Sequence, residues 1–106
     1  MTDTQFPITR DYTERLRLRN QDVAASFSGE YDELPAATKL ALYEYAKSRL
    51  VPGDYLRAVV SNDLRLACHH ADSQNLRTMH LAVRWMYNNA PSTCWGSHEA
   101  FAAWTS

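Results

Sequence analysis

The segment Pro52-Gly53-Asp54-Tyr55-Leu56-Arg57-Ala58-Val59-Val60-Ser61-Asn62-Asp63-Leu64 decides how the middle of this chain is expected to fold. Val51 precedes a proline, which disfavours helical dihedral angles, and Pro52-Gly53 is a turn pair, so a helix is expected to begin at Asp54. On a wheel of about 100° per residue, one face collects the apolar residues Leu56, Val60, Leu64, Ala67 and Ala71. The pattern predicts one helix over residues 54–71.

Asp63 falls within that apolar face. Burying a carboxylate without a partner costs on the order of several kcal/mol, so the group must be satisfied in some way. Either donors from neighbouring parts of the fold hold it, or a bound partner does. The sequence leaves both alternatives open.

Helices are also predicted on both sides of this segment. Pro35 suits the first turn of a helix that ends near Leu50 and is rich in helix-forming residues. Another helix is expected from Asp72 or Ser73 to Asn89, where Ala90-Pro91 stops it. Its expected buried stripe is Leu76, Met79, Val83, Met86 and Tyr87, with His80 at the edge.

The two ends of the chain complete the expected fold. Ser97 caps a short last helix in which Phe101 and Trp104 are the expected buried anchors. Residues 1–9 hold little apolar periodicity and predict a loose lead-in. After them, Leu16 and Val23 fit a helix, although leucine alternates with arginine over residues 15–19 as in a strand. The sequence therefore predicts an all-α fold, a compact single domain of four to five helices over residues 10–106.

Composition excludes several classes of function. A chain of 106 residues is one domain by the usual relation of length to domain count. Its net charge of -1 and pI near 6.4 argue against a protein that coats nucleic acid or an anionic membrane. DNA binding through residues 15–19 is disfavoured because no helix-turn-helix glycine turn follows. No apolar run approaches the roughly 20 residues that cross a bilayer, so a cytoplasmic location is expected.

The sequence also argues against an enzyme, a metal site and a bound cofactor. Cys68 and Cys94 form no Cys-x-x-Cys pair, and we expect both to be reduced. The three glycines are far apart, so no glycine-rich phosphate loop exists. Cys68 falls on the inner side of its predicted helix, where a thiol is usually inert.

Polar and aromatic residues around Asp63 predict a ligand site. Asp63 and His70 are two turns apart and within about 20° of each other on the wheel. Amides, a carboxylate and aromatic rings together suit a nucleotide-sized ligand, with arginines for its phosphates. The predicted ligand-binding set is Asp63, Asn62, Asn75, His70, Arg57, Tyr55 and Trp95. In the alternative interpretation, Asp63 and Asn75 only cap or pin helix ends, the tryptophans fill the core and the arginines are solvated.

Four motifs carry a resemblance to a known family. They are the segment 52–64 quoted above, Ala71-Asp72-x-x-Asn75, Tyr87-Asn88-x-Ala90-Pro91 and Cys94-Trp95-Gly96-Ser97. In order and spacing they resemble a family of small accessory proteins encoded by tailed bacteriophages, over residues 34–104. The resemblance implies a phage protein in the cytoplasm of its bacterial host. It brings no activity with it, but phage chains of this type often block a host immune protein or sequester its nucleotide messenger, which is an analogy.

Two hypotheses of different classes follow. The first is a non-enzymatic counter-defence protein, an oligomer that sequesters a small nucleotide-type immune signal through the predicted set. The second is a protein-binding inhibitor or phage accessory protein, which docks its partner through an exposed aromatic patch of Tyr43, Tyr45 and Trp85. The helix after Pro35 is apolar on more than one face, which favours self-association or a partner in either case.

Overall fold

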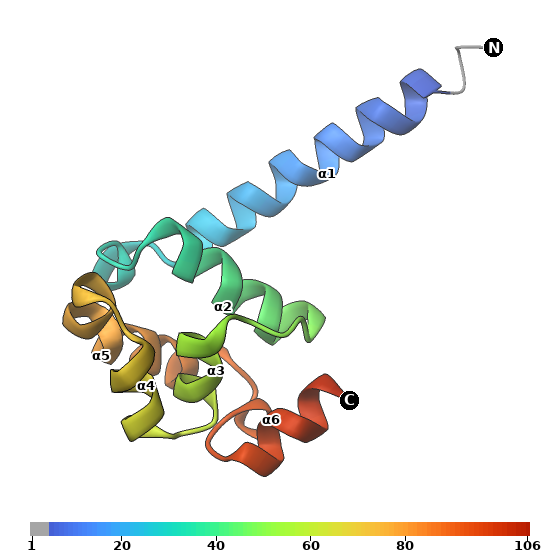
Figure 1. Ribbon diagram of the computed structural model, residues 1–106. Coiled ribbons are helices and arrows are strands. Elements are labelled where there is room, and N and C mark those ends of the chain that lie inside the picture. Colours follow the sequence, from blue (N-terminus) through green and yellow to red (C-terminus); the bar gives the residue numbers. More distant parts are fainter. Residues whose placement is uncertain (1–4) are drawn as a thin grey trace.

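The computed structural model describes the backbone of residues 5–106 and the side chains of residues 13–106. Within this part the chain is all-α, as predicted, with six α-helices and no strand (Figure 1). The helices are α1 (Gln5–Ser26), α2 (Ala36–Ser48), α3 (Asp54–Val60), α4 (Leu64–His70), α5 (Ser73–Asn89) and α6 (His98–Thr105). Two 3₁₀ turns, η2 (Gly29–Tyr31) and η3 (Ser92–Cys94), precede α2 and α6.

The helix predicted over residues 54–71 is in fact two helices, which is why the number exceeds the expected four to five. Asn62 takes a left-handed conformation with φ of 60°, and the backbone N–H of Asp63 donates to the Ala58 carbonyl at 2.9 Å. Asparagine tolerates this conformation better than most residues, so it ends α3. Asp63 then serves as the N-cap of α4. The break also rotates Leu64 out of the predicted apolar face, and this residue is 67% exposed.

One hydrophobic core unites the residues from Phe27 to Phe101. The Trp85 ring of α5 stacks on Phe27 with ring centroids 4.5 Å apart, and its indole N–H donates to the Ser26 carbonyl at 3.0 Å. The buried face of α5 is Thr78, Leu81, Ala82, Trp85 and Met86. The predicted stripe is confirmed for Met86 and in part for Met79 and Val83, which are half-buried against the core. It is wrong for Leu76 and Tyr87, which are 51% and 75% exposed. The helix is apolar on two faces, and the larger Trp85 decides which one is buried.

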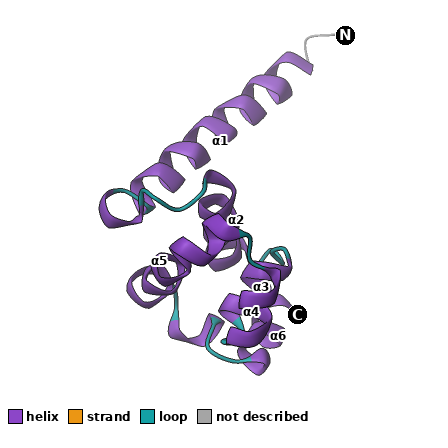
Figure 2. Ribbon diagram, turned by 60° about the vertical axis from the view of Figure 1, so that its left-hand side comes forward, coloured by secondary structure: helices purple, strands orange, loops and turns teal. Residues whose placement is uncertain are grey.

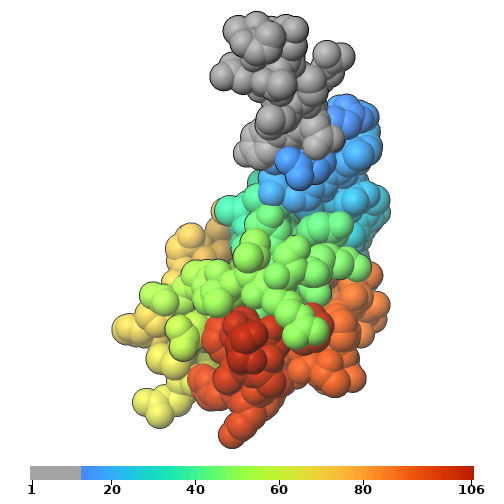
Figure 3. Space-filling view, turned by 90° about the vertical axis from the view of Figure 1, so that its right-hand side faces the viewer, coloured from blue at the N-terminus to red at the C-terminus, as the bar shows by residue number. Residues whose placement is uncertain are grey.

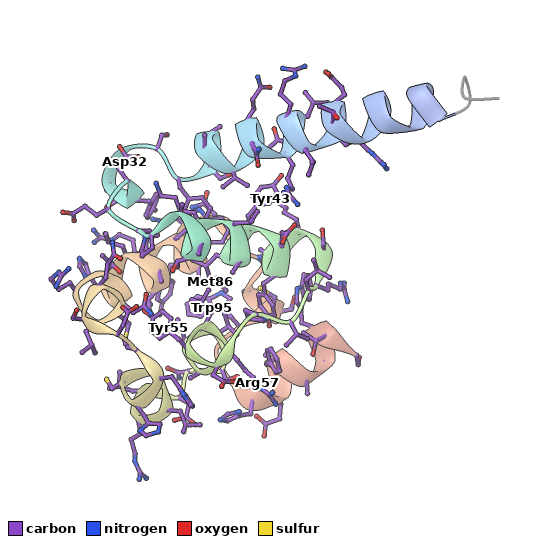
Figure 4. The ribbon with its side chains drawn as sticks, turned by 45° about the horizontal axis from the view of Figure 1, so that its top comes forward. Asp32, Tyr43, Tyr55, Arg57, Met86 and Trp95 are labelled. Carbon is purple, nitrogen blue, oxygen red and sulfur yellow. The ribbon has the colours of Figure 1, made fainter. Side chains whose placement is uncertain are left out.

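Helix α1 projects from the rest of the molecule and contacts α2 (Figures 1 and 2). It begins at Gln5, so the lead-in predicted for residues 1–9 is helical over residues 5–9, and residues 1–4 lie outside the described part. Arg19 of α1 pairs with Glu44 of α2 at 2.8 Å. Tyr43 of α2 faces α1, where burial and the neighbouring Asp22 carboxylate raise its pKa (Figure 4). The second apolar side of α2 is thus covered by α1 rather than left for a partner.

The C-terminal helix closes the other side of α2, and Figure 3 shows the two packed side by side. Ser97 caps α6 by accepting a hydrogen bond from the Ala100 N–H at 3.0 Å, as predicted. Phe101 is buried and stacks on Tyr45 with centroids 5.9 Å apart. The Trp104 indole N–H donates to the Tyr45 carbonyl at 2.7 Å.

The aromatic patch expected from the sequence is not a surface. Tyr45 and Trp85 are fully buried, and the Tyr45 hydroxyl donates to the Cys94 carbonyl at 2.6 Å. Tyr43 is half-buried against the core. The patch is therefore part of the interior, because large aromatic rings contribute most to a core of this size. Among the described residues no helix has the length and apolar character that would span a membrane.

Candidate functional site

Asp63 is satisfied within the fold. Its Oδ1 accepts a hydrogen bond from the backbone N–H of Leu66 at 3.2 Å, as expected of an N-cap. Its Oδ2 lies 2.9 Å from Nε2 of His98, the first residue of α6. The hydrogen bond with His98, followed by that with Leu66, lowers the pKa of the Asp63 carboxyl. The carboxylate that looked unexplained in the sequence thus ties the start of α4 to the start of α6.

Asn62 shares a small hollow with Asp63. The backbone N–H of Asn62 donates to the Val59 carbonyl at 3.0 Å, while its side chain is exposed. The hollow has a volume of about 60 Å³, and Met79 and Val83 of α5 form its opposite wall. This space equals about two water molecules, so it admits the tip of one side chain.

Tyr55 and Asn75 join α3 to α5. The half-buried Tyr55 hydroxyl donates to the Asn75 backbone carbonyl at 3.2 Å. Burial, followed by the charge of nearby Asp72, raises the pKa of Tyr55 to about 12. The Asn75 N–H donates in turn to the Asp72 carboxylate at 2.7 Å, which caps α5. The contacts of Tyr55 and Asn75 are therefore those of a structural clamp between two helices.

The remaining three predicted residues lie in different surroundings. The Arg57 guanidinium lies 5.0 Å from the centre of the Phe101 ring, and Figure 4 shows it between α3 and α6. His70 is exposed beside the His69 ring, with centroids 4.9 Å apart. Trp95 is half-buried and meets the Tyr87 ring edge-on at 4.8 Å.

The predicted set is thus brought together only in part. Asn62 adjoins Asp63 along the chain, and Tyr55 contacts Asn75. Among the described residues, no hydrogen bond or ion pair joins Asp63 to His70, Asn75 or Arg57. The wheel placed Asp63 and His70 on one continuous helix, but they stand at opposite ends of the short α4. His98 was missed because it lies 35 residues from Asp63 and its spacing gives no sign of this contact.

A broad hollow lies along α5, on a surface that we call the outer face of α5: Leu76, Met79, His80, Val83 and Tyr87. This hollow has a volume of about 750 Å³ and is bordered by Met79, His80, Val83, Arg84, Tyr87 and Asn88. Met79 and Val83 also border the small hollow at Asn62 and Asp63, so the two spaces are adjacent. This apolar stripe was visible in the sequence, where it was assigned to the core. Its sign was the spacing of Leu76, Met79, Val83 and Tyr87.

Polar side chains border one flank of the outer face. Arg84 pairs with Glu30 of η2 at 3.1 Å, and the Asn88 amide donates to the Tyr31 hydroxyl at 2.7 Å. Arg77 is exposed on the same helix. In the part of the chain with described side chains, no group of three histidine, cysteine or acidic residues is arranged to hold a metal ion. The site therefore offers apolar contact and cationic hydrogen-bond donors.

Comparison of the chain with models of protein families, with curated proteins and with solved structures found no match.

Proposed function

We propose that this chain is a non-enzymatic protein-binding module and that its partner docks on the outer face of α5. The observation that carries the proposal is the exposure of Leu76 and Tyr87, at 51% and 75%, on a helix whose opposite face is already buried in the core. A solvent-facing side of a helix is normally polar, and an apolar strip there is typical of an interaction surface.

The shape of the surface favours a protein over a small ligand. All six residues that border the larger hollow belong to one helix, so the space has one wall. Small-molecule sites usually enclose about 70–90% of their ligand, which needs walls from several elements. Tyrosine, methionine and arginine, which gather here, are also residue types enriched in protein interfaces.

The predicted nucleotide trap has less support from these contacts. Asp63, Tyr55 and Arg57 each engage a partner within the fold. Asp63 borders two hollows, of about 60 Å³ and about 540 Å³, and the second is bordered by Asp63, Arg65, Leu66 and His69. Asp63 is therefore the one member of the predicted set on the border of that second hollow. Sequestration of a host nucleotide signal stays a prediction, as does the phage origin. If the resemblance to phage accessory proteins holds, the docked partner is a protein of the bacterial host, which matches the second hypothesis drawn from the sequence.

Site-specific photocrosslinking tests the proposal. A benzoylphenylalanine residue is placed at position 87 or, as a control, at exposed position 33 in the connection before α2, and the chain is irradiated in the cells that produce it. We expect a defined adduct from position 87 and none from position 33. Leu76→Asp in the same chain should remove the adduct, because an unpaired charge within an apolar interface is not compensated. Equal adducts from both positions, or none from position 87, would overturn the proposal.

A further inference from the structure

The outer face of α5 has the spacing of a seam between two helices. Leu76, His80, Val83 and Tyr87 follow one another at intervals of four, three and four residues. Leu76, Val83 and Tyr87 are the apolar members of this line and His80 is polar. Residues at such alternating intervals form the contact line when one helix packs lengthwise on another. Resting on the proposed function, we infer that the partner docks an amphipathic helix along α5 and that this helix carries carboxylates on one flank.

The charge of the partner helix follows from Arg77 and Arg84. Each comes one residue after a seam residue, Leu76 or Val83, so the two arginines lie on the same flank, two turns apart. In coiled coils the flanking positions choose the partner through opposite charge. Two guanidinium groups at this spacing match two carboxylates seven residues apart on the docked helix.

Both arginines are available for such contacts. Arg77 is exposed, and among the described residues no carboxylate lies within 4.0 Å of it. Arg84 pairs with Glu30, but the two side chains are 61% and 49% exposed. An ion pair this open to water contributes little to stability, so Arg84 can exchange Glu30 for a carboxylate of the partner at little cost.

The other flank of the seam is apolar. Met79 and Val83 are half-buried and lead into the hollow bordered by Leu64 of α4. Leu64 is exposed and extends the apolar strip beyond α5. The docking surface therefore has an apolar centre, one apolar flank and one cationic flank. It is complementary to a helix with an apolar centre and with carboxylates on the flank that faces the arginines.

A second copy of this chain fits the surface less well. In a symmetric pair the twofold axis places the same patch of both copies together. An antiparallel pair of α5 helices would then bring Arg77 and Arg84 of one copy against the same flank of the other, where like charges repel. The homo-oligomer expected from the sequence would have to use another face.

Three synthetic peptides test the inference with the full chain. All three are helical 22-residue peptides with leucine at every seam position, and they differ only in glutamate, glutamine or lysine at the flanking positions. Fluorescence anisotropy measures their binding at low and at high salt. We expect the glutamate peptide to bind about tenfold tighter than the lysine peptide, with the difference shrinking as salt screens the charges.

Matched charge reversals identify the residues involved. Arg77→Glu should remove or invert the preference for the glutamate peptide, whereas Lys47→Glu, an equal charge change on α2, should preserve it. Both residues are exposed, so both variants should fold, which circular dichroism checks.

Equal affinity of all three peptides for the wild-type chain would overturn the charge inference and leave the docking face standing. Absence of binding by any peptide would overturn the docked helix itself, while the crosslink at position 87 decides the proposed function separately.

Discussion

At the residue scale, Asp63 explains how a carboxylate can stand in an apolar sequence pattern without a ligand. Its two oxygens accept from the Leu66 N–H and face Nε2 of His98. One side chain thereby ends the α3–α4 turn and ties it to α6. The contact also gives the residue a measurable dependence on pH, since the folded chain holds the Asp63 pKa below its ordinary value.

Asp63→Asn should lower the thermal midpoint at pH 7. The folded-state pKa is depressed, so the stabilisation from Asp63 is fully present above the unfolded value of about 3.8 and is lost as the pH falls through the lower folded value. The wild type should therefore exceed the variant at pH 7 and approach it in more acidic solution. Thermal unfolding followed by circular dichroism at several pH values measures this.

Asp32→Asn is the matched control, because Asp32 is exposed and no hydrogen bond or ion pair joins its carboxylate to another described residue. It should leave the midpoint nearly unchanged at pH 7. A difference between wild type and Asp63→Asn that is the same at every pH would contradict the role assigned to the carboxylate.

At the element scale, local chemistry made much of the fold predictable. The bounds of α5 agree with the expected start at Asp72 or Ser73 and end at Asn89, because a capping aspartate and Ala90-Pro91 are signals within the segment itself. A helical wheel shows on which side of a helix the apolar residues lie, but it cannot show that Asn62 takes a left-handed backbone conformation. The break after α3 was therefore missed. The buried face of α5 was misassigned in part because both faces are apolar, and distant contacts such as the stacking of Trp85 on the Phe27 ring, 58 residues away, decide between them.

The candidate site was harder to predict because its contacts also join residues that are distant in the sequence. The sequence singled out Tyr55 as an aromatic ring and Asn75 as an amide for a ligand, and in the structure the Tyr55 hydroxyl donates to the Asn75 carbonyl. Arg57 meets Phe101, a residue of the last helix. Whether a polar side chain is free or engaged depends on such distant partners, and spacing along one segment does not contain them.

Loss of the α5 cap gives a prediction at this scale. Asp72→Ala removes the carboxylate that accepts the Asn75 N–H at 2.7 Å and should destabilise the chain by about 1 kcal/mol. Chemical denaturation monitored by tryptophan fluorescence measures the loss, since Trp85 lies in the same helix. Ser73→Ala, one residue further along, should cost far less. Similar losses in both variants would mean that the cap does not contribute as proposed.

At the scale of the whole molecule, α1 stands apart from the common core. The core residues begin at Phe27, with Val23 packed against them, and the rest of the described part of α1 contacts α2 through exposed or half-buried side chains. The described chain extends 54 × 31 × 23 Å, with a radius of gyration of 15.8 Å, above the roughly 13 Å of a compact chain of this length. Its stability is therefore expected to be uneven.

Hydrogen exchange should reveal that unevenness. Amides of residues 13–22 should exchange well before those of α5 around Ala82, because opening α1 exposes little apolar surface while opening α5 disrupts the core. Mass spectrometry of peptic fragments resolves the two segments. Equal protection of α1 and α5 in the isolated chain would mean that α1 has a further partner, such as another copy, which a dependence on protein concentration would reveal.

Binding by the whole molecule separates the two functions considered for this chain. If the chain docks a protein through α5, linear and cyclic nucleotides, cyclic dinucleotides among them, should leave its thermal midpoint unchanged. A nucleotide at a hundred times its dissociation constant would add about 2.7 kcal/mol and raise the midpoint by roughly 10 °C or more. Such a shift, abolished by Asp63→Asn but kept in Tyr87→Ala, would favour the trap at the Asn62–Asp63 turn. If no nucleotide raises the thermal midpoint and position 87 gives an adduct, the binding function belongs to α5, whose outer face is exposed and apolar.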